Sequence, residues 1–150
     1  MNALLEICKN PLIYTPACCW TAAQVIKFFL LAVVQHKPLH TLLHGGGMPS
    51  SHTATVTGLT TATWLTYGGG GFEFPMALFF SIIVVYDALN VRRQCGREGA
   101  MLNRIARSSA DPYYANAEPF REEMGHTLPE VAAGLVAGLI VAIVLHSLIR

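Results

Sequence analysis

Four long apolar segments are the feature that most limits how this chain can fold. A transmembrane helix needs about 20 consecutive, mostly apolar residues. The chain has four runs of about that length: Ile13–Gln35, Ser51–Gly69, Phe74–Val91 and Val131–Ile149. The first holds one charge, Lys27, the third holds Asp87, and the other two hold none. Since so little polar surface remains to cover four such helices, we expect an all-α integral membrane bundle rather than a soluble bundle of buried helices.

Composition agrees with this fold class. Of the 150 residues, 53% are hydrophobic and only 13% are charged, which is more apolar than an ordinary soluble domain. The length predicts a single domain over residues 1–150. A net charge of +1 gives no indication of a nucleic-acid partner. The four cysteines have neither paired nor metal-binding spacing, so we expect them to be reduced.

The polar stretch between the third and fourth runs extends from Arg92 to Met124. Residues 94–107 have helical character, with apolar side chains among basic ones, and we expect a helix lying at the membrane interface. Its arginines would contact lipid headgroups. Residues 108–119 contain Asp-Pro and Glu-Pro pairs and are predicted to form a loop.

Alternation of the spans predicts where the reactive residues lie. The end of the first span, the start of the second, the end of the third and the start of the fourth share one side. That side collects three groups: Gly45–His52, Asp87 with Arg92 and Arg93, and Gly125–Glu130. Nearly every residue capable of chemistry is therefore expected at one end of the bundle.

The octet Gly45–His52 is typical of a loop that leads into a helix. Pro49 suits a first helical turn, and the free N–H groups of a helix N-terminus bind anions such as phosphate. His52 can exchange a proton near neutral pH. The alternative is a helix cap after a flexible loop, with an incidental histidine.

A second histidine, His126, precedes the fourth span. Thr127-x-x-Glu130 fits a capping box, in which Glu130 bonds back to the backbone. Alternatively, Glu130 accepts a hydrogen bond from the His126 imidazole and leaves the other ring nitrogen free to attack. The two roles are not fully exclusive.

These motifs resemble a known family. Pro49-Ser50-Ser51-His52 is similar to the Pro-Ser-x-His motif of the type 2 phosphatidic acid phosphatase superfamily, and His126-x-x-x-Glu130 resembles its His-x-x-x-Asp motif. With Tyr86-Asp87-Ala88 and Arg92-Arg93, the pattern resembles the divergent branch of that superfamily, described as acid phosphatase and vanadium-dependent haloperoxidase-related. The resemblance covers most of the chain from about Gln24 onward.

The resemblance implies a role for each matching residue. His126 takes the place of the nucleophile, Glu130 of the carboxylate that orients it, and His52 of the general acid. Ser50, Ser51 and the backbone around Gly47 would bind phosphate. No metal or other cofactor is implied, and the implied substrate is a membrane lipid phosphate.

Two basic motifs of the superfamily are absent. The first is a Lys followed seven residues later by Arg-Pro, but Val34 and Gln35 occupy those positions after Lys27. The second is a Ser-Arg pair six residues before the nucleophile, and residues 118–121 contain none. We therefore expect the phosphate cations to be Arg92, Arg93 and Lys27.

Charges inside apolar spans are rare, and are usually paired or functional. Lys27 and Asp87 could form a buried ion pair with each other. Alternatively, Lys27 reaches the phosphate while Asp87 aligns Arg92 or Arg93. His36, His40 and His44 share a helical spacing, but Pro38 and the lack of other ligands favour a basic strip over a metal site.

The function that we expect is metal-independent hydrolysis of a membrane-embedded phosphate ester, through a phosphohistidine at His126. The missing basic motifs favour an alternative, a non-catalytic membrane scaffold that retains an anion pocket. A small-anion transporter using Lys27 and Asp87 is a third reading. Gly134 and Gly138 predict GxxxG-type helix packing, within the protomer or in a homo-oligomer.

Basic residues near span ends predict sidedness, because they are retained in the cytoplasm. Seven lie in loops on the site-bearing side: Lys37, Arg92, Arg93, Arg97, Arg104, Arg107 and Arg121. The other side has only Lys9 and Arg150. We expect a protein of the cell (inner) membrane whose site faces the cytoplasm. A cysteine introduced near Ser109 should react with an impermeant reagent only after intact cells are opened, and ready labelling of intact cells would mean that the site faces outward.

Overall fold

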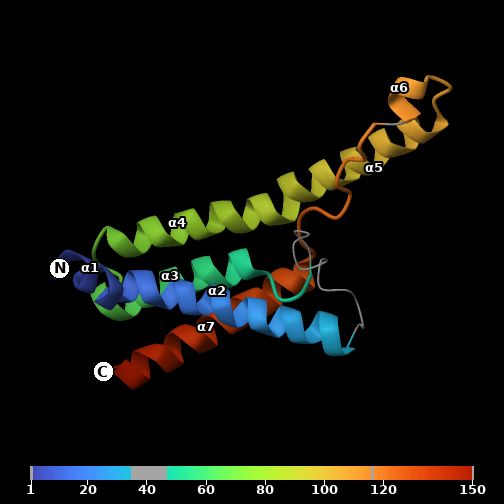
Figure 1. Ribbon diagram of the computed structural model, residues 1–150. Helices are drawn as coiled ribbons and strands as arrows, with labels where there is room; N and C mark the ends of the chain where they lie inside the picture. Colours follow the sequence, from blue (N-terminus) through green and yellow to red (C-terminus); the bar gives the residue numbers. More distant parts are fainter. Residues whose placement is uncertain (1, 35–46, 116, 150) are drawn as a thin grey trace.

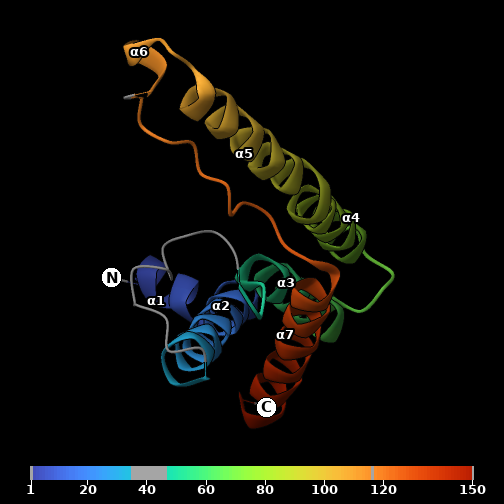
Figure 2. The same ribbon diagram turned by 90° about the vertical axis from the view of Figure 1, so that its right-hand side faces the viewer.

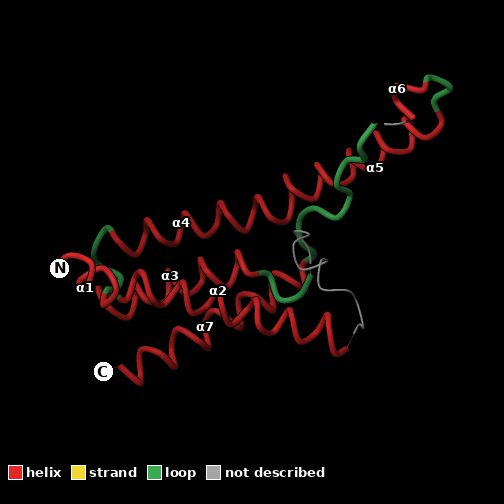
Figure 3. The backbone as a smooth tube through the Cα atoms, in the orientation of Figure 1, coloured by secondary structure: helices red, strands yellow, loops and turns green. Residues whose placement is uncertain are grey.

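The computed structural model describes residues 2–34, 47–115 and 117–149, and every regular element in these ranges is a helix (Figures 1 and 3). Gly45, Gly46 and the three spaced histidines lie outside the described residues. In chain order the elements are α1 (Asn2–Lys9), α2 (Pro11–Phe29), the π-helical turn η1 (Leu30–Val34), α3 (Ser51–Tyr67), α4 (Glu73–Tyr86), the π-helical turn η3 (Asp87–Val91), α5 (Arg92–Ser108), α6 (Pro112–Ala115) and α7 (Leu128–Ile149).

The core of the bundle is formed by α2, α3 and α7, which contact one another pairwise. Small residues allow this close approach. Gly58 of α3 lies directly against the Cys19 side chain of α2, and a Cβ at Gly138 of α7 would lie 2.5 Å from the Ala54 carbonyl oxygen of α3. The Cys19 thiol also donates to the Gly138 carbonyl, with Sγ and O 3.5 Å apart. The predicted GxxxG packing therefore operates within the protomer.

Helix α4 packs mainly against α3. Hydroxyl groups join the two helices: the Thr60 and Ser81 oxygens are 2.7 Å apart, and Ser81 also donates to the Val56 carbonyl at 3.0 Å. The outer face of α4 exposes large apolar side chains such as Phe79 and Ile83. Such a face suits contact with lipid rather than water.

Within the described ranges, three helical segments are long and apolar enough to cross a membrane: Pro11–Val34, Glu73–Ser108 and Leu128–Ile149. The all-helical prediction is confirmed, but the count of four spans is not. Helix α3 has 17 residues, or roughly 26 Å at 1.5 Å per residue, which is short of a full bilayer core. It is also the helix that α2, α4 and α7 surround.

The predicted helix over residues 94–107 is confirmed as α5. It continues from α4 through η3 and projects beyond the ends of α2, α3 and α7, instead of folding across the end of the bundle (Figures 1 and 2). Its placement at a membrane interface stays a prediction. The predicted loop over residues 108–119 contains the short helix α6.

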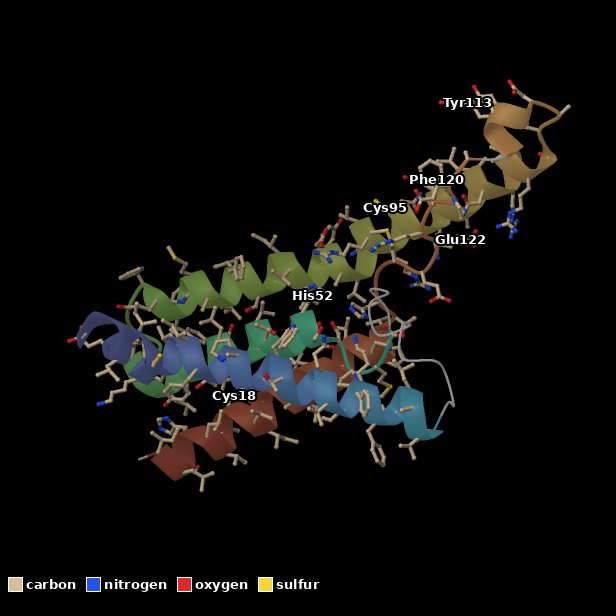
Figure 4. All side chains as sticks on the ribbon, in the orientation of Figure 1. Cys18, His52, Cys95, Tyr113, Phe120 and Glu122 are labelled. Atoms are coloured by element: carbon tan, nitrogen blue, oxygen red, sulfur yellow. The ribbon has the colours of Figure 1, made fainter. Side chains whose placement is uncertain are left out.

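The chain returns from α6 to α7 in extended form along α5 (Figure 4 labels Phe120 and Glu122 of this segment). Two glycines of α5 leave room for its backbone: Gly96 faces Glu122, and Gly99 faces Arg121. The Asn103 side chain pairs with Phe120 as a strand would, donating to its carbonyl at 2.9 Å and accepting from its N–H at 2.9 Å. The segment is thereby held in register up to the start of α7.

Candidate active site

The reactive residues predicted from the two histidine motifs meet at one end of the bundle. The N-termini of α3 and α7 lie together there, beside the junction of α4 with α5 (Figure 1). The ring centroids of His52 and His126 are 6.2 Å apart, with the rings tilted by 59°. The predicted convergence is therefore present in the fold.

His126 is buried and is held by two hydrogen bonds. Its side chain is 2% exposed, its backbone N–H donates to the Ala88 carbonyl at 2.9 Å, and its Nδ1 lies 2.9 Å from Oε2 of Glu130. An ionised carboxylate only accepts hydrogen bonds, so Nδ1 carries the hydrogen. The lone pair then lies on Nε2, the nitrogen that a nucleophilic imidazole uses.

Glu130 carries out both of the roles considered for it. The oxygen that bonds His126 also accepts the backbone N–H of Thr127 at 3.1 Å, which is the capping-box bond. One carboxylate therefore caps α7 and orients the imidazole. This arrangement ties the position of His126 to the first turn of the helix.

The first turn of α3 presents His52. Ser50 is the N-cap: its oxygen accepts the Thr53 N–H at 3.3 Å and the Thr53 hydroxyl at 3.0 Å, and both residues are fully buried. Ser50 therefore has a structural role in holding the turn. Ser51 is buried as well, whereas His52 is exposed. N–H groups of a first helical turn have no partner within the helix and attract anions.

A backbone contact joins the two motifs. The Ser50 N–H donates to the Glu130 carbonyl at 3.0 Å. A Cβ at Gly134, one turn further along α7, would lie 2.5 Å from the Ser50 carbonyl oxygen. Only glycine allows α7 to lie this close to the start of α3.

Lys27 is buried in α2, with 4% of its surface exposed. Its aliphatic stem passes Gly47, where a Cβ would lie 3.7–3.8 Å from the Lys27 side-chain carbons. Gly47 has φ +97°, a conformation that favours glycine. Nearby, the Gln24 side-chain oxygen is buried and has no hydrogen-bond partner among the described residues. Lys27 and Gln24 therefore lie at the edge of the site, beside Gly47.

Asp87 pairs with Arg92, with Oδ2 and Nε 2.6 Å apart. No ion pair between Asp87 and Lys27 is present among the described residues, so Asp87 aligns Arg92 rather than Lys27. That Lys27 reaches a phosphate stays a prediction. The charged groups of Arg92, Lys27 and Asp87 lie near enough to His52 to interact electrostatically with its imidazole. Arg93, by contrast, has its backbone packed against Gly125, whose φ is +81°, and lines a separate hollow along α5.

Nothing in the sequence pattern indicates a role for the Ala88 carbonyl. In η3 the Arg92 N–H bonds back to Asp87, and the Ala88 carbonyl accepts the His126 N–H. Such π-helical turns occur often at functional sites. Thr53, which completes the cap of α3, was also not predicted. Among the described residues, no group of three or more His, Cys, Asp or Glu side chains is gathered as a metal-ligand set.

Comparisons with known proteins agree with the motifs. The chain matches the divergent PAP2 family over residues 8–141. It is 34% identical over 135 residues to a protein of Bacillus subtilis strain 168 that is named uncharacterized membrane protein YuiD, covering 82% of this chain and 85% of that protein. No solved structure matches the chain. The family predicted from the motifs is confirmed: the chain belongs to the divergent PAP2 family of membrane proteins.

Proposed function

We propose that this protein is a metal-independent phosphatase of membrane lipid phosphates, with residues 1–150 forming a single phosphatase-like domain. The observation that carries the proposal is the buried pair of His126 and Glu130 at 2.9 Å, with His52 facing it at 6.2 Å between ring centroids. An oriented imidazole opposite a second imidazole supplies the nucleophile and the acid that phosphoryl transfer requires.

The proposed reaction has two steps. In the first, Nε2 of His126 attacks phosphorus, the bond from phosphorus to the ester oxygen breaks, and protonated His52 gives its proton to the leaving alkoxide. In the second, neutral His52 removes a proton from water, which attacks the phosphohistidine, and the phosphorus–nitrogen bond breaks to release phosphate. Both groups return to their starting states.

Charge on the transferring phosphoryl oxygens needs stabilisation. We assign the stabilisation of this charge to Lys27, Arg92 and the first-turn N–H groups of α3. The proposal is supported by the position of Lys27 against Gly47 and by the Asp87–Arg92 pair at 2.6 Å. These groups would stand in for the two basic motifs that the chain lacks.

In this proposal α3 completes a fourth crossing, both termini lie outside the cell, and the site faces the cytoplasm. The substrates are then lipid phosphates of the inner leaflet. Support comes from the basic residues of the α5 arm, by which we mean α5 (Arg92–Ser108) with α6. This arm projects from the end of the bundle that bears the site.

The absence of the two basic motifs favours a second candidate, a non-catalytic membrane protein that binds a phosphate group. In that case the same pocket would bind phosphate or vanadate without turnover. A wild-type protein that binds phosphate but hydrolyses none of a broad panel of lipid phosphates would favour this candidate.

Replacement of the nucleophile tests the enzyme directly. His126→Ala should abolish phosphate release from lipid phosphates by the purified protein without added metal, because the proposed phosphohistidine can no longer form. His146→Ala, the same change at the far end of α7, is the control and should leave activity unchanged. Full activity in His126→Ala would rule out His126 as the nucleophile.

Replacement of the second histidine tests the general acid. His52→Ala should slow hydrolysis of alkyl phosphates by about 10²–10⁴-fold, and that of aryl phosphates much less, because good leaving groups need no acid.

The two adjacent arginines provide a matched pair for the phosphate cation. Arg92→Gln should weaken vanadate and substrate binding by about ten- to hundredfold, since a charge-assisted hydrogen bond contributes roughly 1.5–3 kcal/mol. Arg93→Gln should leave vanadate binding unchanged, because Arg93 lines a different hollow. Isothermal titration with vanadate measures both. If neither change alters vanadate binding, the assignment of Arg92 is wrong, and Lys27 and the first-turn N–H groups of α3 hold the anion without it.

A further inference from the structure

An apolar groove of about 690 Å³ lies between α2 and α7. Every residue that lines it is apolar. Ile26 and Leu30 contribute from the α2 side, and Ala133, Ala137 and Ile140 from α7. The volume is in the range of sites that hold an organic ligand, roughly 300–1,000 Å³.

One end of this groove reaches the candidate active site. Met48 and Pro49 line that end and directly follow Gly47, over which the Lys27 stem passes. Pro129 also lines it and directly precedes Glu130, the carboxylate that orients His126. From Pro129 the lining runs along α7 to Val141, roughly 18 Å at 1.5 Å per residue.

Small side chains on α7 leave the groove open. Ala133 and Ala137 are one helical turn apart on the groove side, next to the glycines whose face packs on α3. A large residue at either position would fill the space. The small side chains at these two positions therefore leave space for a ligand to lie along α7.

We propose that the groove binds the hydrocarbon chain of a long-chain phosphate ester, with its phosphate at His126. This inference rests on the proposed function for the phosphate end. The occupant must be apolar along roughly 18 Å and must end in a group suited to Lys27 and Arg92, and a long-chain alkyl phosphate meets both conditions. Because the bilayer is as apolar as the groove, moving the chain from lipid into the groove contributes little binding free energy. The effect of the groove is to orient the ester for attack.

A second groove, of about 470 Å³, lies between α3 and α4 and provides an internal control. Hydroxyl-bearing side chains line part of it, including Thr61. Tyr86, which precedes Asp87, and Leu135, which follows Gly134, are among its lining residues, but no residue of the two histidine motifs lines it. We assign no substrate chain to it.

Photolabelling locates the chain without requiring turnover. The probe is hexadecyl phosphate with a diazirine in the middle of its chain, applied to the full-length protein in detergent and mapped by mass spectrometry. Label should concentrate on residues of the α2–α7 groove, and excess hexadecyl phosphate should displace it whereas hexadecanol should not. Ala137→Phe should remove this label, and Thr61→Phe should not. Label spread over all apolar helix faces, or found mainly between α3 and α4, would overturn the assignment.

Kinetics give an independent readout if the protein is active. The ratio of kcat/KM for hexadecyl phosphate to that for butyl phosphate should fall at least about tenfold in Ala137→Phe, because the long chain can no longer place its phosphate correctly. The milder Ala137→Val should lower the ratio less, which guards against a folding defect. An unchanged ratio in both variants would overturn the groove assignment while leaving the phosphatase proposal standing. If the wild type hydrolyses neither ester but is labelled in the groove, the phosphatase proposal fails and the chain site stands.

Discussion

The contact between the backbones of α3 and α7 is the constraint on which the candidate site depends. Gly134 lets α7 lie against the Ser50 carbonyl, and the Ser50 N–H in turn donates to the Glu130 carbonyl at 3.0 Å. Two helix N-termini are thereby fixed side by side, each followed or preceded by a histidine. A side chain at Gly134 would separate them, and the 6.2 Å between the imidazole rings would be lost. In a membrane, where apolar burial does not drive helices together, such close backbone packing is what holds a bundle in one arrangement.

The α5 arm imposes the second constraint, because it determines where the chain enters α7. Gly96, Gly99 and Asn103 form one side of α5 and hold the returning segment along it. The segment ends at Gly125, whose positive φ turns the backbone close past Arg93, and at His126, whose N–H binds the Ala88 carbonyl. The nucleophile is thus attached on one side to the α4–α5 junction and on the other to α7. The position of the buried His126 imidazole therefore depends on the α5 arm that lies outside the bundle.

Much of this could be predicted from the sequence, for identifiable reasons. Helix runs follow from apolar length, and alternation of their directions predicts that His52, Arg92 and His126 meet. Family membership followed from the motifs and is confirmed. Other features depend on tertiary geometry that a single sequence does not encode locally. Whether Asp87 would pair with Lys27 or Arg92 depended on the π-helical turn η3, which has no sequence signature. The number of spans depends on tertiary packing for a similar reason. In the short, threonine-rich helix α3, the Thr60 and Thr63 hydroxyls bond to backbone carbonyls, and Thr60 also bonds to Ser81 of α4, so polar composition does not fix how deep the helix lies.

In the proposed site, Nε2 of His126 bonds the phosphorus while Glu130 holds Nδ1. A crystal structure of the protein with orthovanadate tests it most directly, since vanadate adopts the trigonal-bipyramidal geometry of a phosphoryl-transfer transition state. Vanadium should be bonded to Nε2 of His126, with the Glu130 hydrogen bond intact and vanadate oxygens contacting Lys27, Arg92 or the first turn of α3. Vanadate bound away from His126, or a site left empty at concentrations that saturate the protein in solution, would contradict it.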